Sequence, residues 1–149
     1  MRFLILLLIL PLSGCSTVQM TEYISRVEHP YDRKIYASFE KVTSAFMFVL
    51  KNQGWVITSE SEPFVYERDE RYDNNGYRNL LIFTGLRKNY HFLYSTFTHL
   101  NILIHSIGNI CDVEIRYEAR TPLVKQFTSV RNDQLVQNIL DAVEQEVNK

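Results

Sequence analysis

Cys15 is the residue whose neighbours most clearly predict chemistry: its thiol follows two small residues, Ser13 and Gly14, close behind a short apolar run. Arg2 gives the chain a positive start and residues 3–10 are all apolar, which is the layout of a cleavable secretory signal. The run is too short to span a bilayer, because a transmembrane helix needs about 20 apolar residues. The sequence therefore predicts an exported chain whose signal covers residues 1–14.

The motif Leu12-Ser13-Gly14-Cys15 resembles the lipobox of bacterial lipoproteins. The resemblance implies that the signal is cut before Cys15, whose thiol receives a diacylglyceryl group. Each buried CH₂ contributes roughly 0.8 kcal/mol, so one acyl chain binds a bilayer marginally and two or three anchor a protein stably. Ser16 favours the outer membrane of a two-membrane bacterium, since in this family an Asp there is typical of inner-membrane retention. We expect a lipid anchor in the periplasmic leaflet of the outer membrane.

A disulfide is the competing interpretation of Cys15, and Cys111 is the other cysteine of the chain. The two interpretations exclude each other, because a lipidated sulfur is a thioether and cannot pair. The match to the lipobox at every position favours lipidation. Cys111 is then a lone thiol in an oxidising compartment, and we expect it to be buried.

Composition predicts a folded chain with little affinity for polyanions. The formal net charge is −1, and loss of Arg2 with the signal takes it to −2, which argues against a nucleic-acid partner. Residues 15–30 are polar with no sustained apolar period, and they predict a lipidated N-terminus and flexible tether of about 50 Å when stretched. Residues 31–149 have the length of a single domain.

Apolar periodicity predicts the elements of this domain. Helices are expected at residues 39–53 and 133–147, with Ser38 and Asn132 as N-caps and Gly54 ending the first. Strands are expected at residues 31–37, 55–59, 64–69, 77–84, 96–105 and 110–120, with a hairpin turn at Asn75-Gly76. The last strand alternates most clearly, so Cys111, Val113, Ile115, Tyr117 and Ala119 are expected on a core face and the charged residues between them in solvent.

This order of elements predicts an α+β fold, an antiparallel sheet with two helices packed on one face. Together with the segment Ile35-Tyr36-Ala37-Ser38-Phe39-Glu40-Lys41-Val42 and the following Gly54-Trp55-Val56-Ile57, it is similar to the helix-grip domains of small proteobacterial lipoproteins of the BamC type. The resemblance covers residues 31–147. BamC-type proteins have two such domains, whereas this chain has room for one.

Residues that bind metals or catalyse reactions do not fall at useful spacings. His99 and His105 share a strand face but lie roughly 20 Å apart on an extended strand, and His29 and His91 have no partner at ligand spacing. The acidic run in residues 69–76 departs from the calcium-loop pattern. We therefore expect no metal, no cofactor and no catalytic residues.

Charged residues on two segments allow further interpretations. The carboxylates of the last strand, Asp112, Glu114 and Glu118, alternate with arginines, which favours a cross-strand charge ladder over glycosidase chemistry. Residues 86–94 mix basic and aromatic side chains, which fits either an ordinary strand or contact with lipid headgroups or an envelope partner.

The leading hypothesis is a lipid-anchored, non-catalytic envelope lipoprotein whose domain binds other envelope proteins. The alternative is a carrier or sensor that binds a lipid or hydrophobic ligand between the first helix and the sheet. A closed interior around Phe46, Trp55 and Tyr117 favours the first, and an apolar cavity of several hundred Å³ there favours the second. The ligand-binding residues are not predicted.

Overall fold

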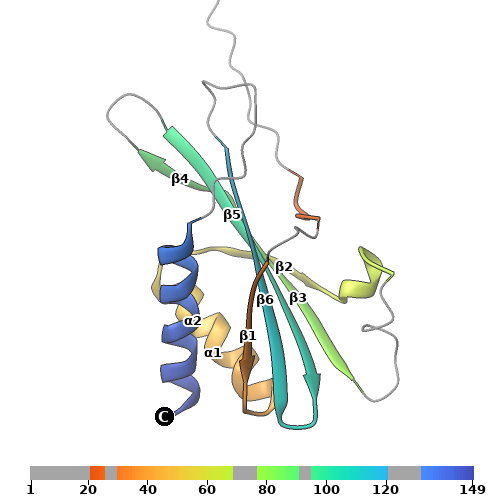
Figure 1. Cartoon of the computed structure of the whole chain (residues 1–149). Helices are drawn as coiled ribbons and strands as arrows, with labels where there is room; N and C mark the ends of the chain where they lie inside the picture. The colour runs from red at the N-terminus through yellow and green to blue at the C-terminus, as the bar shows by residue number, and fades with distance from the viewer. Residues whose placement is uncertain (1–20, 26–29, 69–76, 91–94, 121–131) are drawn as a thin grey trace, which may run out of the picture.

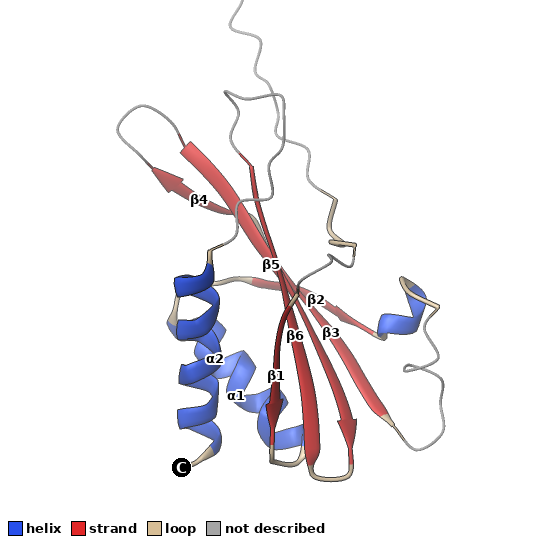
Figure 2. Cartoon of the chain, in the orientation of Figure 1, coloured by secondary structure: helices blue, strands red, loops and turns tan. Residues whose placement is uncertain are grey.

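An antiparallel six-stranded sheet carries two helices on one face (Figures 1 and 2), as the sequence predicted. The computed structural model describes residues 21–25, 30–68, 77–90, 95–120 and 132–149. Its elements are β1 (Tyr31–Ile35), α1 (Phe39–Asn52), β2 (Ile57–Ser61), the 3₁₀ turn η1 (Pro63–Val65), β3 (Arg78–Thr84), β4 (Arg87–Tyr90), β5 (Ser95–Ile107), β6 (Ile110–Arg120) and α2 (Asp133–Val147). Among these residues no helix is long and apolar enough to cross a bilayer.

The long strand β5 organises the sheet, whose order is β1-β6-β5-β3-β2. One edge of β5 pairs with β6 from Phe97 to Ile107. Its other edge pairs with β3 and then with β4, which follow each other along the same side of β5. Between β3 and β4 the chain passes Gly85, whose N–H donates to the Val56 carbonyl at 2.7 Å. A side chain at Gly85 would meet Thr58 at 3.3 Å, so the glycine allows this close approach.

The main core lies between the helices and one face of the sheet. Even-numbered residues of β5 and odd-numbered residues of β6 meet the apolar faces of α1 and α2 there. Fully buried members include Phe46, Leu100, Ile102, Ile115, Ile139 and Leu140. Cys111 belongs to the same layer and is a buried free thiol, which confirms its predicted place on the core face. Burial raises the pKa of the Cys111 thiol, which keeps it protonated and unreactive.

Local sequence explains where α1 begins and ends. The Ser38 side chain accepts from the Lys41 N–H, and Glu40 lies in the first turn, where the helix dipole favours an acid. At the other end Gly54 has a φ of +78°. The Gly54 N–H donates to Lys51 at 3.0 Å and the Trp55 N–H to Leu50 at 2.9 Å, which is the Schellman arrangement.

The prediction of a strand at residues 64–69 is wrong: residues 64–68, the part of this range that the structure describes, form no strand. Pro63 instead begins η1, and its carbonyl accepts from both Tyr66 and Glu67 at 2.9 Å. Proline has a fixed φ and no N–H to give to a sheet ladder, so it favours the start of a turn. The strand predicted at residues 77–84 is observed as β3, and it pairs with β2 and β5. The predicted turn at Asn75-Gly76 lies outside the described residues.

Phe46 should be far more important for stability than Phe48, two residues along α1. Phe46 is fully buried and Phe48 is 50% exposed. We expect Phe46→Ala to lower the free energy of unfolding by about 3–5 kcal/mol, because it removes buried apolar surface and leaves a cavity. Phe48→Ala should change it by less than about 1 kcal/mol. Urea denaturation of both variants measures the difference, and equal losses would contradict the packing described above.

Candidate interaction surface on the open face of the sheet

The predicted lipidation motif Leu12, Ser13, Gly14 and Cys15 lies outside the described residues, as do His29 and His91. The structure instead draws attention to the side of the sheet that faces away from the helices, here called the open face. Odd-numbered residues 97–105 of β5 and even-numbered residues 112–120 of β6 lie on it.

Arg116 is the centre of the open face. Its side chain is fully buried. The guanidinium grips Glu67 with two nitrogens, Nη1 to Oε1 at 2.6 Å and Nη2 to Oε2 at 3.1 Å, while Nε donates to Glu114 at 2.6 Å. Burial by itself lowers the pKa of Arg116, but the hydrogen bonds to the two carboxylates outweigh it and the pKa lies above its ordinary value. Arg116 is therefore a permanent buried cation held by two anions.

The same guanidinium holds the chain segment at residues 21–25. Arg116 Nη1 donates to the Tyr23 hydroxyl at 2.7 Å and to the Ile24 carbonyl at 2.9 Å. Asn101, also fully buried, accepts from the Ile24 N–H at 2.6 Å and donates to the Glu22 carbonyl at 3.0 Å. Burial raises the pKa of Tyr23, so its hydroxyl stays protonated. The segment is thus fixed to the sheet by both backbone and side-chain bonds.

These contacts correct two sequence expectations. The flexible tether predicted for residues 15–30 does not describe residues 21–25, where Ile24 is 8% exposed and bonded to Asn101. The solvent face predicted for residues 110–120 holds Arg116, which no solvent reaches. Apolar periodicity predicted neither the docking of residues 21–25 nor the burial of Arg116. It indicates which side of a strand faces the main core, and it gives no information about a chain segment that covers the opposite side. The apolar pair Tyr23 and Ile24, in otherwise polar surroundings, was the available clue.

Aromatic contacts connect the docked segment to η1. Tyr23 stacks on Tyr66 with ring centroids 4.9 Å apart, and Tyr66 meets the edge of Phe83 at 5.2 Å. Phe83 belongs to a small second core with Leu81 and Leu103, on the open face. Since Glu67 and Tyr66 directly follow η1, the turn is held at its end by an ion pair and by stacking.

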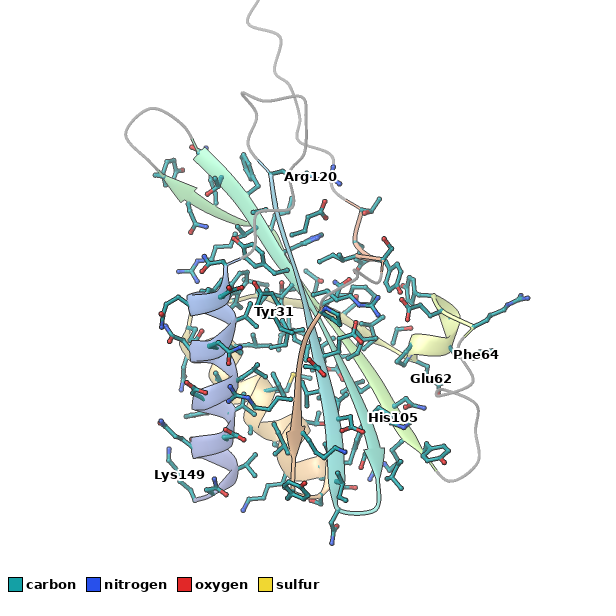
Figure 3. The ribbon with its side chains drawn as sticks, in the orientation of Figure 1. Tyr31, Glu62, Phe64, His105, Arg120 and Lys149 are labelled. Carbon is teal, nitrogen blue, oxygen red and sulfur yellow. The ribbon has the colours of Figure 1, made fainter. Side chains whose placement is uncertain are left out.

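Beyond these restraints η1 exposes apolar side chains. Phe64 is 48% exposed and Val65 is 70% exposed. The turn borders a hollow of about 470 Å³ at the end of β2, where Figure 3 shows Glu62 and Phe64. Its lining is mixed and includes Phe39, Glu60, Glu62, Phe64, Tyr77 and Arg78. Arg78 lies 4.3 Å from the centre of the Phe39 ring and pairs with Glu40.

The described histidines have structural partners. His99 Nε2 lies 3.0 Å from Glu118, and burial lowers the pKa of His99. His105 Nδ1 lies 2.5 Å from the Asn79 side-chain oxygen. Within the described ranges no three His, Cys, Asp or Glu side chains are grouped so that they could hold a metal ion.

Comparison with protein-family models and with curated proteins finds no match to this chain.

Replacing Arg116 tests whether it holds the open face together. Arg116→Met removes the cation that pairs with the largely buried carboxylates of Glu67 and Glu114, so we expect a loss of about 3 kcal/mol or more in unfolding free energy. Amide hydrogen exchange should accelerate at Ile24 more than in β6. Adding Glu67→Gln and Glu114→Gln should restore part of the stability.

The matched control for Arg116 is Lys34→Met. Lys34 also pairs across strands, with Asp112 at 3.6 Å, but both side chains are about half exposed. Its loss should cost less than about 1 kcal/mol and leave exchange at Ile24 unchanged. Equal effects of the two substitutions would contradict the central role of Arg116.

Proposed function

We propose that this protein is a lipid-anchored, non-catalytic lipoprotein of the cell envelope, whose domain binds another envelope protein through η1 and the adjoining hollow. The resemblance of Leu12-Ser13-Gly14-Cys15 to a lipobox supports the anchor. The observation that supports the binding role is that η1 exposes apolar side chains to solvent while the residues that follow it are bonded to the open face of the sheet. Phe64 and Val65 project from a segment whose end is bonded to Arg116 and stacked on Tyr23.

A fixed apolar turn suits protein recognition for a physical reason. Ordering a loop on binding costs conformational entropy, and a preorganised loop avoids most of that cost. Buried aromatic anchors beside polar groups are the usual centre of a protein interface. Phe64 supplies the aromatic side chain, while Arg78, Glu60 and Glu62 supply charges around the hollow. A partner with an apolar side chain flanked by charged groups fits this surface.

The alternative function, a carrier of a hydrophobic ligand, lacks a supporting observation in the described part of the chain. Phe46 and Trp55 are buried in the main core. Neither they nor Tyr117 line the hollow at η1 or a second hollow, of about 490 Å³, near the C-terminus. The first hollow reaches α1 only at Phe39, its first residue, and the second is lined by residues around the start of α1 and the end of α2.

Mass spectrometry of the intact protein from a two-membrane bacterium tests the anchor. We expect a chain that begins at Cys15 and carries the mass of a diacylglyceryl group, because the thiol is the only attachment point that the motif offers. Cys15→Ser should abolish the lipid mass and the membrane fraction together. Cys111→Ala is the matched control, since that thiol is buried in the core, and it should leave both unchanged. An unmodified Cys15 would contradict the anchor.

Photo-crosslinking from η1 tests the binding role. A photoreactive residue at Val65 should capture a defined envelope protein in whole cells, and Phe64→Ser should reduce that capture several-fold because it removes the aromatic anchor. The same photoreactive residue at Gln145, exposed on α2, is the control and should not capture that protein. If Val65 captures no more than Gln145 and the purified protein carries a bound lipid besides its anchor, the carrier function should replace this one.

A further inference from the structure

We propose that the open face at β4 rests on the anionic lipid surface to which the chain is anchored, so that the sheet stands in a defined orientation on the bilayer. This inference rests on the proposed lipid anchor and goes beyond it, because an anchor alone would let the domain take any orientation. The contact surface consists of Leu86, Lys88, Tyr90 and Phe97, with Arg120 beside them, and is called here the β4 patch.

Strand register brings the β4 patch together. Lys88 faces Phe97 across the β4–β5 pair, and Phe97 faces Arg120 across the β5–β6 pair, so a basic, an aromatic and a basic residue form one row. Lys88 Nζ lies 4.7 Å from the centre of the Tyr90 ring and 5.7 Å from that of Phe97. Tyr90 is 78% exposed and Leu86 is 48% exposed. Lys88 is the exposed cation of this row, and the Tyr90 ring lies exposed beside it.

The chemistry of the β4 patch matches a headgroup layer. Aromatic side chains of intermediate polarity favour the membrane interface, and each lysine or arginine near an anionic surface adds attraction. The one carboxylate described on this part of the open face, Glu118, is already paired with His99 and Arg120. Since Arg120 and Glu118 offset each other, the described residues of the patch carry the single positive charge of Lys88 beside the apolar and aromatic side chains.

The length of chain between lipid and domain puts the β4 patch within reach of the bilayer. Docking of residues 21–25 leaves five residues between Cys15 and Thr21, and the six Cα-to-Cα steps from Cys15 to Thr21 span at most roughly 20 Å. Asn101, which binds this segment, lies four residues from Phe97 on β5, or roughly 13 Å along the strand. Figure 1 shows that the described chain begins in the half of the molecule that holds β4 and the end of β6, away from the C-terminus.

Depth-dependent fluorescence quenching tests this orientation in the full, lipidated chain. Tyr90→Cys carries an environment-sensitive dye, while Cys111 stays unlabelled because it is buried. The protein is reconstituted in vesicles of phosphatidylethanolamine and phosphatidylglycerol that contain a headgroup-level quencher. We expect quenching at position 90 to exceed that of a dye at Gln145→Cys several-fold. Lys88→Glu should weaken the docked state by about fivefold or more, the factor expected for one lysine at an anionic surface.

Two controls separate the possible outcomes. Lys41→Glu makes the same charge change on the exposed first turn of α1 and should have no effect. Intact mass on the same sample reports lipidation. A lipidated chain whose dye at position 90 is quenched no more than at 145, or is quenched equally in phosphatidylcholine vesicles, would overturn the orientation and leave the proposed function standing. A Cys15 without lipid would overturn both.

Discussion

A single buried guanidinium, that of Arg116, ties together parts of the chain that are far apart in sequence. It meets Glu114 on its own strand, Glu67 after η1, and Tyr23 and Ile24 near the start of the described chain. Taking a cation out of water costs several kcal/mol unless geometry and hydrogen bonds offset it. Here bidentate pairing with one carboxylate and a bond to a second supply that compensation. These partners together fix the arrangement of the open face around Arg116.

This arrangement joins two surfaces with different proposed roles. The docked segment at residues 21–25 sets where the chain that precedes it leaves the domain, and η1 exposes Phe64 and Val65, the residues proposed to bind a partner. Both are attached to the sheet through Arg116 and through the stack of Tyr23 on Tyr66. The two surfaces therefore share one buried ion-pair network.

The two faces of the sheet are stabilised by different interactions. Between the helices and the sheet, large apolar side chains such as Phe46 and Leu140 exclude water, and the stability of that core comes from apolar burial. On the open face the apolar part is small, and Asn101 and Arg116 are buried there by hydrogen bonds to the segment that covers them. Buried polar groups specify partners precisely, since each unpaired donor or acceptor is costly. The first core supports the fold, and the second layer fixes the position of the covering chain.

Sequence periodicity alone determined the fold class and the bounds of several long elements, although β5 extends one residue before and two beyond the predicted strand at residues 96–105. It placed β6 and α2 at their observed limits and α1 within one residue, because each depends on local apolar spacing and on caps such as Ser38 and Asn132. The resemblance of Leu12-Ser13-Gly14-Cys15 to a lipobox can also be read from the sequence, since that motif is local. Only the tertiary structure decided that residues 21–25 cover the sheet and that η1 is a turn. The partners that bury Arg116 lie 49 and 92 residues away, and no local pattern encodes which charge will meet which across such distances.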